Sequence, residues 1–284
     1  MAGQHSSSGN FGGGGGGDNV SSTTRRLTAE DSNQISVLKA PFALLSVGPS
    51  QSGVFLLFLN STFSVLYLHF SGKSHFCRDI IRHRQSRLSK PVDKVYYFYD
   101  VFQTRDFDDL ENELGDDIEF IQGQCTTEWL NSNIGEAPTR GRDSIPLIVT
   151  DDLDSQLTRD TELIFTNHVH HQELAYISIF HQLYANNASH RAISNNATYL
   201  HLTPNKRDRT YLSVLSRQIN GPGYGRPFMK MFEFATETLP QSVGKGRRGG
   251  YLFLDLHQLT PNYLKIRTNI FSEMGYPPVV LNFI

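Results

Sequence analysis

Two short segments of the chain carry the residues of a phosphate-binding loop, but 19 residues separate Gly53 of the first from Lys73 of the second. A loop of this kind has the pattern G-x-x-x-x-G-K-[ST]: backbone N–H groups surround the phosphates, the Lys neutralises them and the hydroxyl holds Mg²⁺. Here Gly53 is followed by Val54, so the pattern is complete only when residues 54–72 are left out. The expected nucleotide-binding residues are Gly48, Pro49, Ser50, Gln51, Ser52 and Gly53 from the first segment, and Gly72, Lys73, Ser74 and His75 from the second.

A pair of acidic residues follows a second apolar run. Residues 145–150 end in Asp151 and Asp152. In a nucleotide hydrolase, such a pair binds Mg²⁺ through water and orients or deprotonates the attacking water. We therefore expect Ser74 and Asp151 to be the Mg²⁺ ligands and Asp152 to act on the water. An Asp after a strand can instead cap the next helix, but the position downstream of a phosphate loop favours catalysis.

Further polar residues are weaker candidates. His181 and Gln182 end the apolar run 175–180 and could contact the γ-phosphate, although a strand end that faces water is an equal alternative. Arg191, Arg207 and Arg209 are candidates for an arginine finger, with surface charge as the alternative, and we place Arg191 among the catalytic residues.

Two other groups of residues suggest binding. Lys245, Arg247 and Arg248 lie in a Gly-rich loop that could contact DNA phosphates, although most such loops are simply solvated. Five histidines lack zinc-site spacing and have no Cys partner, so we expect hydrogen-bonded or solvated side chains. They are His168, His170, His171, His181 and His190.

The separating segment is anomalous in composition. Residues 54–72 are rich in Phe, Leu and Ser, every Val codon begins with GT, and nineteen codons keep the reading frame open. We interpret the segment as a translated, unspliced intron or an equivalent gene-model error. Residues 54–70 contain no Asp, Glu, Lys or Arg and approach the length of a membrane span. Polar residues such as Asn60 and Thr62 interrupt the run, so we do not expect a membrane anchor.

The elements that must position these residues alternate between short apolar runs and amphipathic stretches. This alternation predicts an α/β fold with a mostly parallel, buried sheet flanked by helices. We expect strands at 41–47, 94–99, 118–121, 145–150, 175–180, 198–202 and 250–256, and helices at 73–88, 162–168, 207–219 and 228–238. Residues 1–34 are a Gly/Ser-rich tail that we expect to be disordered, and 35–284 are expected to form one domain.

Composition excludes several classes of protein. The chain has 26 Lys+Arg against 28 Asp+Glu, so it is not a wholly basic nucleic-acid binder. Cys77 and Cys125 can form at most one bridge, which excludes a disulfide-stapled scaffold. A mean hydropathy of −0.35 is unlike that of a polytopic membrane protein.

The order of these segments resembles the DNA-packaging ATPases of the FtsK–HerA P-loop class, found in poxviruses, virophages and Polinton-type elements. The resemblance is carried, over residues 37–271, by ALLSVGPSQSG, GKSHF, IEFIQG, LIVTDDL, AYISIF, ASHRAIS, LTPNKRDR, GYLFLDL and LKIRTNIF. By position it implies Lys73 and Ser74 as the loop pair and Asp151 and Asp152 as the acidic pair. The family usually has Gln-Asn where this chain has His181-Gln182.

The resemblance implies an FtsK/HerA-like P-loop NTPase domain and a function. The enzyme would hydrolyse ATP with Mg²⁺ and drive double-stranded DNA through a homo-oligomeric ring, a hexamer, into a capsid, with capsid or portal proteins as partners. We expect a soluble intracellular protein of the host cytoplasm or nucleus, or of the virion, encoded by a virus-derived mobile element. The alternatives are a catalytically dead relic of such an ATPase and an unrelated single-pass membrane protein anchored by residues 54–70.

Overall fold

A computed structural model describes most of the chain after residue 34. The described residues are 35–49, 54–55, 68–69, 72–102, 104–135, 143–185, 187–205, 209–238, 250–270 and 278–282. The expected tail, most of the segment 54–72, and Ser50, Gln51, Ser52 and Gly53 lie outside them. So do Arg207 and the three candidate DNA contacts, Lys245, Arg247 and Arg248.

The sheet is the scaffold of the molecule, and six of its nine strands are parallel. Its order is β11-β10-β9-β8-β1-β7-β6-β4-β5. The parallel strands are β1 (Phe42–Val47), β4 (Val92–Tyr99), β5 (Ile118–Gln122), β6 (Ile145–Asp151), β7 (Ala175–Phe180) and β8 (Tyr199–Leu202). Three antiparallel strands extend the sheet beyond β8: β9 (Leu252–Asp255), β10 (Ile266–Thr268) and β11 (Val279–Val280). The predicted α/β class with a mostly parallel sheet is confirmed.

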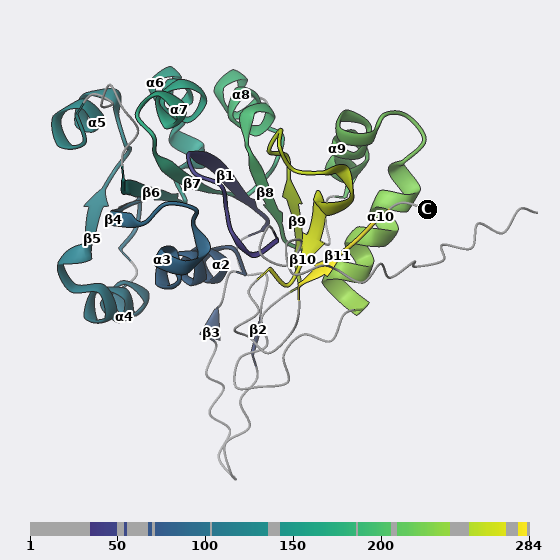
Figure 1. Ribbon diagram of the computed structural model, residues 1–284, viewed down its shortest axis with the longest axis horizontal. Helices are drawn as coiled ribbons and strands as arrows, with labels where there is room; N and C mark the ends of the chain where they lie inside the picture. Colours follow the sequence, from purple (N-terminus) through teal and green to yellow (C-terminus); the bar gives the residue numbers. More distant parts are fainter. Residues whose placement is uncertain are drawn as a thin grey trace, which may run out of the picture.

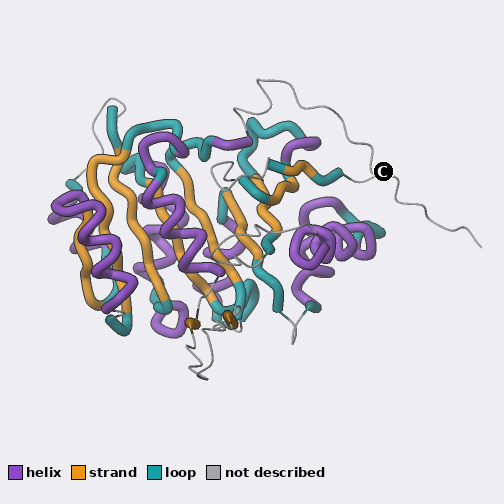
Figure 2. The backbone as a smooth tube through the Cα atoms, turned by 90° about the horizontal axis from the view of Figure 1, so that it is seen from below, coloured by secondary structure: helices purple, strands orange, loops and turns teal. Residues whose placement is uncertain are grey.

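Helices cover both faces of the sheet, as Figures 1 and 2 show. On one face lie α5 (Thr127–Asn133), α6 (Arg159–Leu163), α7 (Val169–His171) and α8 (Ala188–Asn196). On the other lie α2 (Gly72–Arg82), α3 (Arg84–Arg87) and α4 (Thr104–Leu114). The pair α9 (Thr210–Asn220) and α10 (Gly225–Glu233) lies beside the antiparallel strands.

Central strands are buried on both faces because each face carries helices. All six residues of β1 are buried. Ala43, Leu45 and Val47 pack into the core under α5–α10, whereas Phe42 and Leu44 pack into the core under α2 and α4. This alternation follows from the two-residue period of a strand, and it explains why β1 is a continuous apolar run.

Several predicted helix bounds differ from the structure. The single helix expected over 73–88 is two helices, since α2 ends at Arg82 and α3 begins at Arg84. The helix expected over 162–168 begins earlier, where Thr158 caps α6 by accepting a hydrogen bond from the Thr161 N–H. It continues as the π-helix η3 (Ile164–His168). The helix at 228–238 likewise begins at Gly225 and ends in the π-helix η4 (Phe234–Thr238).

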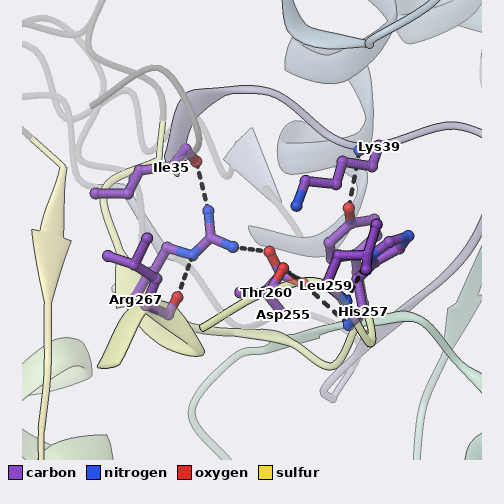
Figure 3. Close-up of polar contacts among 9 residues, drawn as sticks. Ile35, Lys39, Asp255, His257, Leu259, Thr260 and Arg267 are labelled. Atoms are coloured by element: carbon purple, nitrogen blue, oxygen red, sulfur yellow. Dashed lines mark hydrogen bonds and ion pairs between the residues drawn. The ribbon is translucent and has the colours of Figure 1, made fainter. Parts of the chain in front are cut away.

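A buried ionic network ties the start of the domain to the antiparallel end of the sheet (Figure 3). The Arg267 guanidinium donates to the Ile35 and Leu264 carbonyls, both at 2.7 Å, and to Asp255 Oδ2. The other Asp255 oxygen accepts from the Thr260 hydroxyl at 3.0 Å. Arg267 is only 1% exposed, so its charge is offset by protein groups rather than by water.

Within the part of the chain that the structure describes, no helix combines the length and apolar character needed to cross a membrane.

Candidate functional site

Gly48 and Lys73, one residue from each half of the interrupted loop, meet in the folded chain. Gly48 directly follows β1, and Lys73 lies in the first turn of α2. The Lys73 ammonium donates a hydrogen bond to the Gly48 carbonyl oxygen, and the Lys73 residue is 1% exposed. Residues that the sequence separates by 25 positions are therefore in direct contact.

A short hairpin closes the segment between them. The strands β2 (Val54–Phe55) and β3 (Leu68–His69) pair antiparallel, Val54 with His69 and Phe55 with Leu68. They form a separate two-stranded sheet that stands apart from the main one (Figure 1). The pairing brings the beginning and the end of the segment together, which allows α2 to start next to the end of β1.

The first glycine of the loop is required by packing. A Cβ atom at Gly48 would lie 1.7 Å from the Thr203 Oγ1, a distance at which no side chain fits. The Thr203 N–H and hydroxyl both donate to the Val47 carbonyl, at 2.9 and 3.1 Å, and the Gly48 N–H donates to the Phe180 carbonyl at 3.1 Å. The start of the loop is thus held between the ends of β8 and β7.

Asp151 ends β6, which is separated from β1 by β7, and it is almost completely buried. The residue is 3% exposed, and its Oδ2 accepts a 2.6 Å hydrogen bond from the Tyr97 hydroxyl. Its Oδ1 is buried without a hydrogen-bond partner among the described residues. Burial, reinforced by the charge of Asp152, raises the pKa of Asp151 from 3.8 to about 6, against the opposing effects of Tyr97 and Lys73.

The pKa of Lys73 shifts in the opposite direction to that of Asp151. Burial lowers the pKa of its ammonium below the usual value, while the carboxylates of Asp152, Asp151 and Asp154 act in the other direction. Desolvation therefore disfavours the charges of both Lys73 and Asp151, whereas their mutual attraction favours both. A buried cation beside a cluster of carboxylates is the charge arrangement that a bound polyphosphate and a divalent cation would complete.

Asp152 turns the chain out of the sheet. Its backbone adopts a left-handed φ of 56°, and its side chain is 45% exposed. Its Oδ1 lies 3.4 Å from His181 Nε2, and the other ring nitrogen of His181 lies 3.1 Å from the Asp154 carboxylate. Asp154, the first residue of the 3-10 helix η2 (Asp154–Gln156), was not predicted. The available signal was a third carboxylate in the sequence LIVTDDLD.

The structure places the other candidates less directly. Ser74 and His75 follow Lys73 in α2 and are half-buried, and Pro49 is half-buried after Gly48. Gln182 is exposed beside His181, and Arg191 is exposed on α8, so their catalytic roles stay predictions. Arg209 is paired with Glu233 at 2.7 Å and Glu237 at 2.8 Å, which holds it against α10 and η4.

The described histidines do not form a metal-binding cluster. Across the described residues, no three His, Cys, Asp or Glu side chains are grouped so that they could hold a metal ion by themselves.

Comparisons with known proteins do not show a family for the chain. No protein-family model and no curated protein matches the chain. A solved structure described as "The cytoplasmic domain of EssC" is similar to it with a TM-score of 0.37 and 8% sequence identity. The match covers 82% of this chain and 43% of that one, so the chain spans less than half of that protein's length. A likeness at this level carries no inference about activity.

Replacing Asp151 with Asn should stabilise the ligand-free protein at pH 7. The native carboxyl holds its proton up to a pH of about 6, whereas the unfolded one loses it near pH 3.8. The wild-type free energy of unfolding should therefore fall as the pH rises between these values, by at most about 3 kcal/mol. Asp151→Asn keeps an acceptor for Tyr97 and should remove this fall.

Urea denaturation from pH 4 to 7 measures the effect of Asp151→Asn. The matched control is Asp109→Asn, which changes an exposed carboxyl of α4 and should leave the pH profile as in the wild type. A variant less stable than the wild type at pH 7 would mean that the protein stabilises the ionised Asp151.

Proposed function

We propose that the chain is a Mg²⁺-dependent P-loop ATPase. The observation that carries the proposal is the contact between Lys73 and Gly48, which reunites an interrupted phosphate loop. The carboxylates of Asp151 and Asp152, at the carboxyl end of β6, interact electrostatically with the Lys73 ammonium. In open α/β sheets, ligands bind outside the carboxyl ends of the strands.

Each residue then has a definite task. The Lys73 ammonium, which donates to a carbonyl in the ligand-free chain, would instead donate to phosphate oxygens of ATP. The Ser74 hydroxyl and the unpartnered Asp151 Oδ1 fit a hard cation, because both present oxygen atoms. Bound Mg²⁺ would neutralise charge on the phosphates. The half-exposed Asp152 carboxylate would orient the attacking water and accept its proton.

We further propose that hydrolysis drives movement of double-stranded DNA through a homo-oligomeric ring. This finer proposal rests on the resemblance of the segments ASHRAIS, LTPNKRDR and LKIRTNIF to DNA-packaging ATPases. The viral origin, the hexameric state and the capsid or portal partners rest on the same resemblance. A relic that binds nucleotide without turnover is the second candidate, favoured by the insertion within the loop.

The direct test is ATP hydrolysis by the purified full chain with and without double-stranded DNA. We expect Mg²⁺-dependent hydrolysis that DNA stimulates several-fold, and single-stranded DNA of equal length is the control. Nucleotide binding without turnover would support the relic. If the chain does not bind ATP, the proposal is wrong.

Deleting residues 54–72 should preserve the fold and increase hydrolysis. Within the described residues, β2 and β3 pair only with each other, so their removal leaves the nine-stranded sheet intact and joins Gly53 directly to Lys73. We expect an unchanged urea midpoint and a higher kcat, since the loop no longer has to be closed by a hairpin. Unfolding of the deletion variant would show that the segment belongs to the domain.

Sequencing the transcript tests the origin of the segment separately. A message lacking the nineteen codons is expected if they are an intron, and a uniform message that retains them would refute that interpretation.

A further inference from the structure

His181 lies between two carboxylates at the ends of β6 and β7. The register pairs Asp151 of β6 with Ile179 of β7, so the residues after both strands emerge side by side. The His181 N–H donates to Asp154 Oδ2 at 3.0 Å, and its Nδ1 lies 3.1 Å from both oxygens of the same carboxylate. Asp154 thereby fixes the backbone and the ring of His181 together.

The ring directs its other nitrogen towards Asp152. His181 Nε2 and Asp152 Oδ1 are 3.4 Å apart. Among the described residues, only the His181 side chain lies within ion-pair distance of the Asp152 carboxylate. Asp152 also follows the regular strand in a left-handed conformation, so the sheet does not fix the direction of its side chain. The imidazole is therefore in a position to orient this carboxylate.

The local charges favour a protonated ring. The charges of the Asp152 and Asp154 carboxylates and of the Lys73 ammonium all act on His181. The hydrogen bond to Asp154 raises the pKa of His181 above its usual value, while burial and Lys73 act against it. Burial would raise the pKa of Asp154, but the hydrogen bonds from His181 outweigh burial and lower it.

We infer that His181 is a positioning residue: anchored by Asp154, its ring holds the Asp152 carboxylate in the orientation that accepts the proton of the attacking water. The inference rests on the proposed ATPase function. It differs from the expectation that His181 contacts the γ-phosphate, because both ring nitrogens already face carboxylates. A phosphate contact would affect ATP binding, whereas positioning of Asp152 affects turnover.

Steady-state kinetics separate the two roles. His181→Ala should lower kcat about 10-fold and change the KM for ATP less than twofold, since only the alignment of the base is lost. In an Asp152→Asn background, His181→Ala should have no further effect on kcat. A raised KM for ATP, or an additive loss in the double variant, would overturn the inference. His171→Ala, which removes an exposed imidazole from α7, is the matched control.

A second measurement does not require turnover. The imidazole titration of His181 can be followed by NMR in the full chain. Asp152→Asn should lower the pKa of His181 by about half a unit, and Asp154→Asn should lower it further. The exposed-carboxyl control Asp109→Asn should not change it. A titration that is indifferent to Asp152→Asn would overturn the inference even if the chain hydrolyses no ATP, and an absence of hydrolysis alone counts against the proposed function only.

Discussion

Lys73→Ala should abolish ATP hydrolysis, lowering kcat/KM about 100- to 1000-fold, the range found when one preorganised donor to a developing charge is removed. Lys73 is a buried cation that contacts Gly48, so Lys73→Ala removes the ammonium from the start of the loop. Hydrolysis of radiolabelled ATP and binding of a fluorescent ATP analogue measure the two parts of the loss.

The control for Lys73→Ala is Lys90→Ala, which also removes one lysine charge, but at the amino ends of the parallel strands, away from Lys73. Lys90 precedes β4 and pairs at 2.7 Å with Glu173, which precedes β7, so both lie at the amino ends of the strands. This variant should hydrolyse ATP as the wild type does. Wild-type activity in Lys73→Ala would show that the phosphates bind elsewhere.

Arg267→Met should lower the free energy of unfolding by about 3–5 kcal/mol, the range for a buried pair broken on one side. The variant leaves the Asp255 carboxylate without its cation and leaves two carbonyls, those of Ile35 and Leu264, without their donor (Figure 3). Burial already lowers the pKa of Arg267 to about 10, so the charge is costly even when paired.

Urea denaturation measures this loss, and two further variants interpret it. The double variant Arg267→Met/Asp255→Asn should recover part of the stability, because no unpaired charge remains buried. Arg82→Ala breaks an exposed pair, Arg82 with Glu113 at 2.7 Å, and should cost less than about 1 kcal/mol. Equal losses in Arg267→Met and Arg82→Ala would refute the role of burial.

The strands were predictable because their signal is local. The run 175–180 has the same bounds in the sequence and in β7, since both neighbouring layers of helices bury it completely. The helix α4 was not predicted, although Phe107, Leu110 and Leu114 recur at helical spacing and pack against the sheet. The acidic residues between them obscured that pattern.

Short elements were less accessible to sequence analysis. The helices α5 and α8 have only seven and nine residues. Their clearest signals were caps: Thr126 accepts from the Trp129 N–H and Asn187 from the Ser189 N–H. The strands β10 and β11 have three and two residues, too few for a period, and they exist because β9 and β10 offer free edges to pair with.

The sequence by itself determined which residues are candidates for chemistry. It singled out Gly48, Lys73, Asp151 and Asp152, because each has a local signature of glycine, charge or position after an apolar run. It also predicted an α/β sheet to present them. Only the tertiary structure decided that Lys73 reaches Gly48 across the intervening segment, and that Asp154 and His181 join Asp152. Contacts of this kind depend on the order and register of parallel strands, which bring together residues that no local pattern relates.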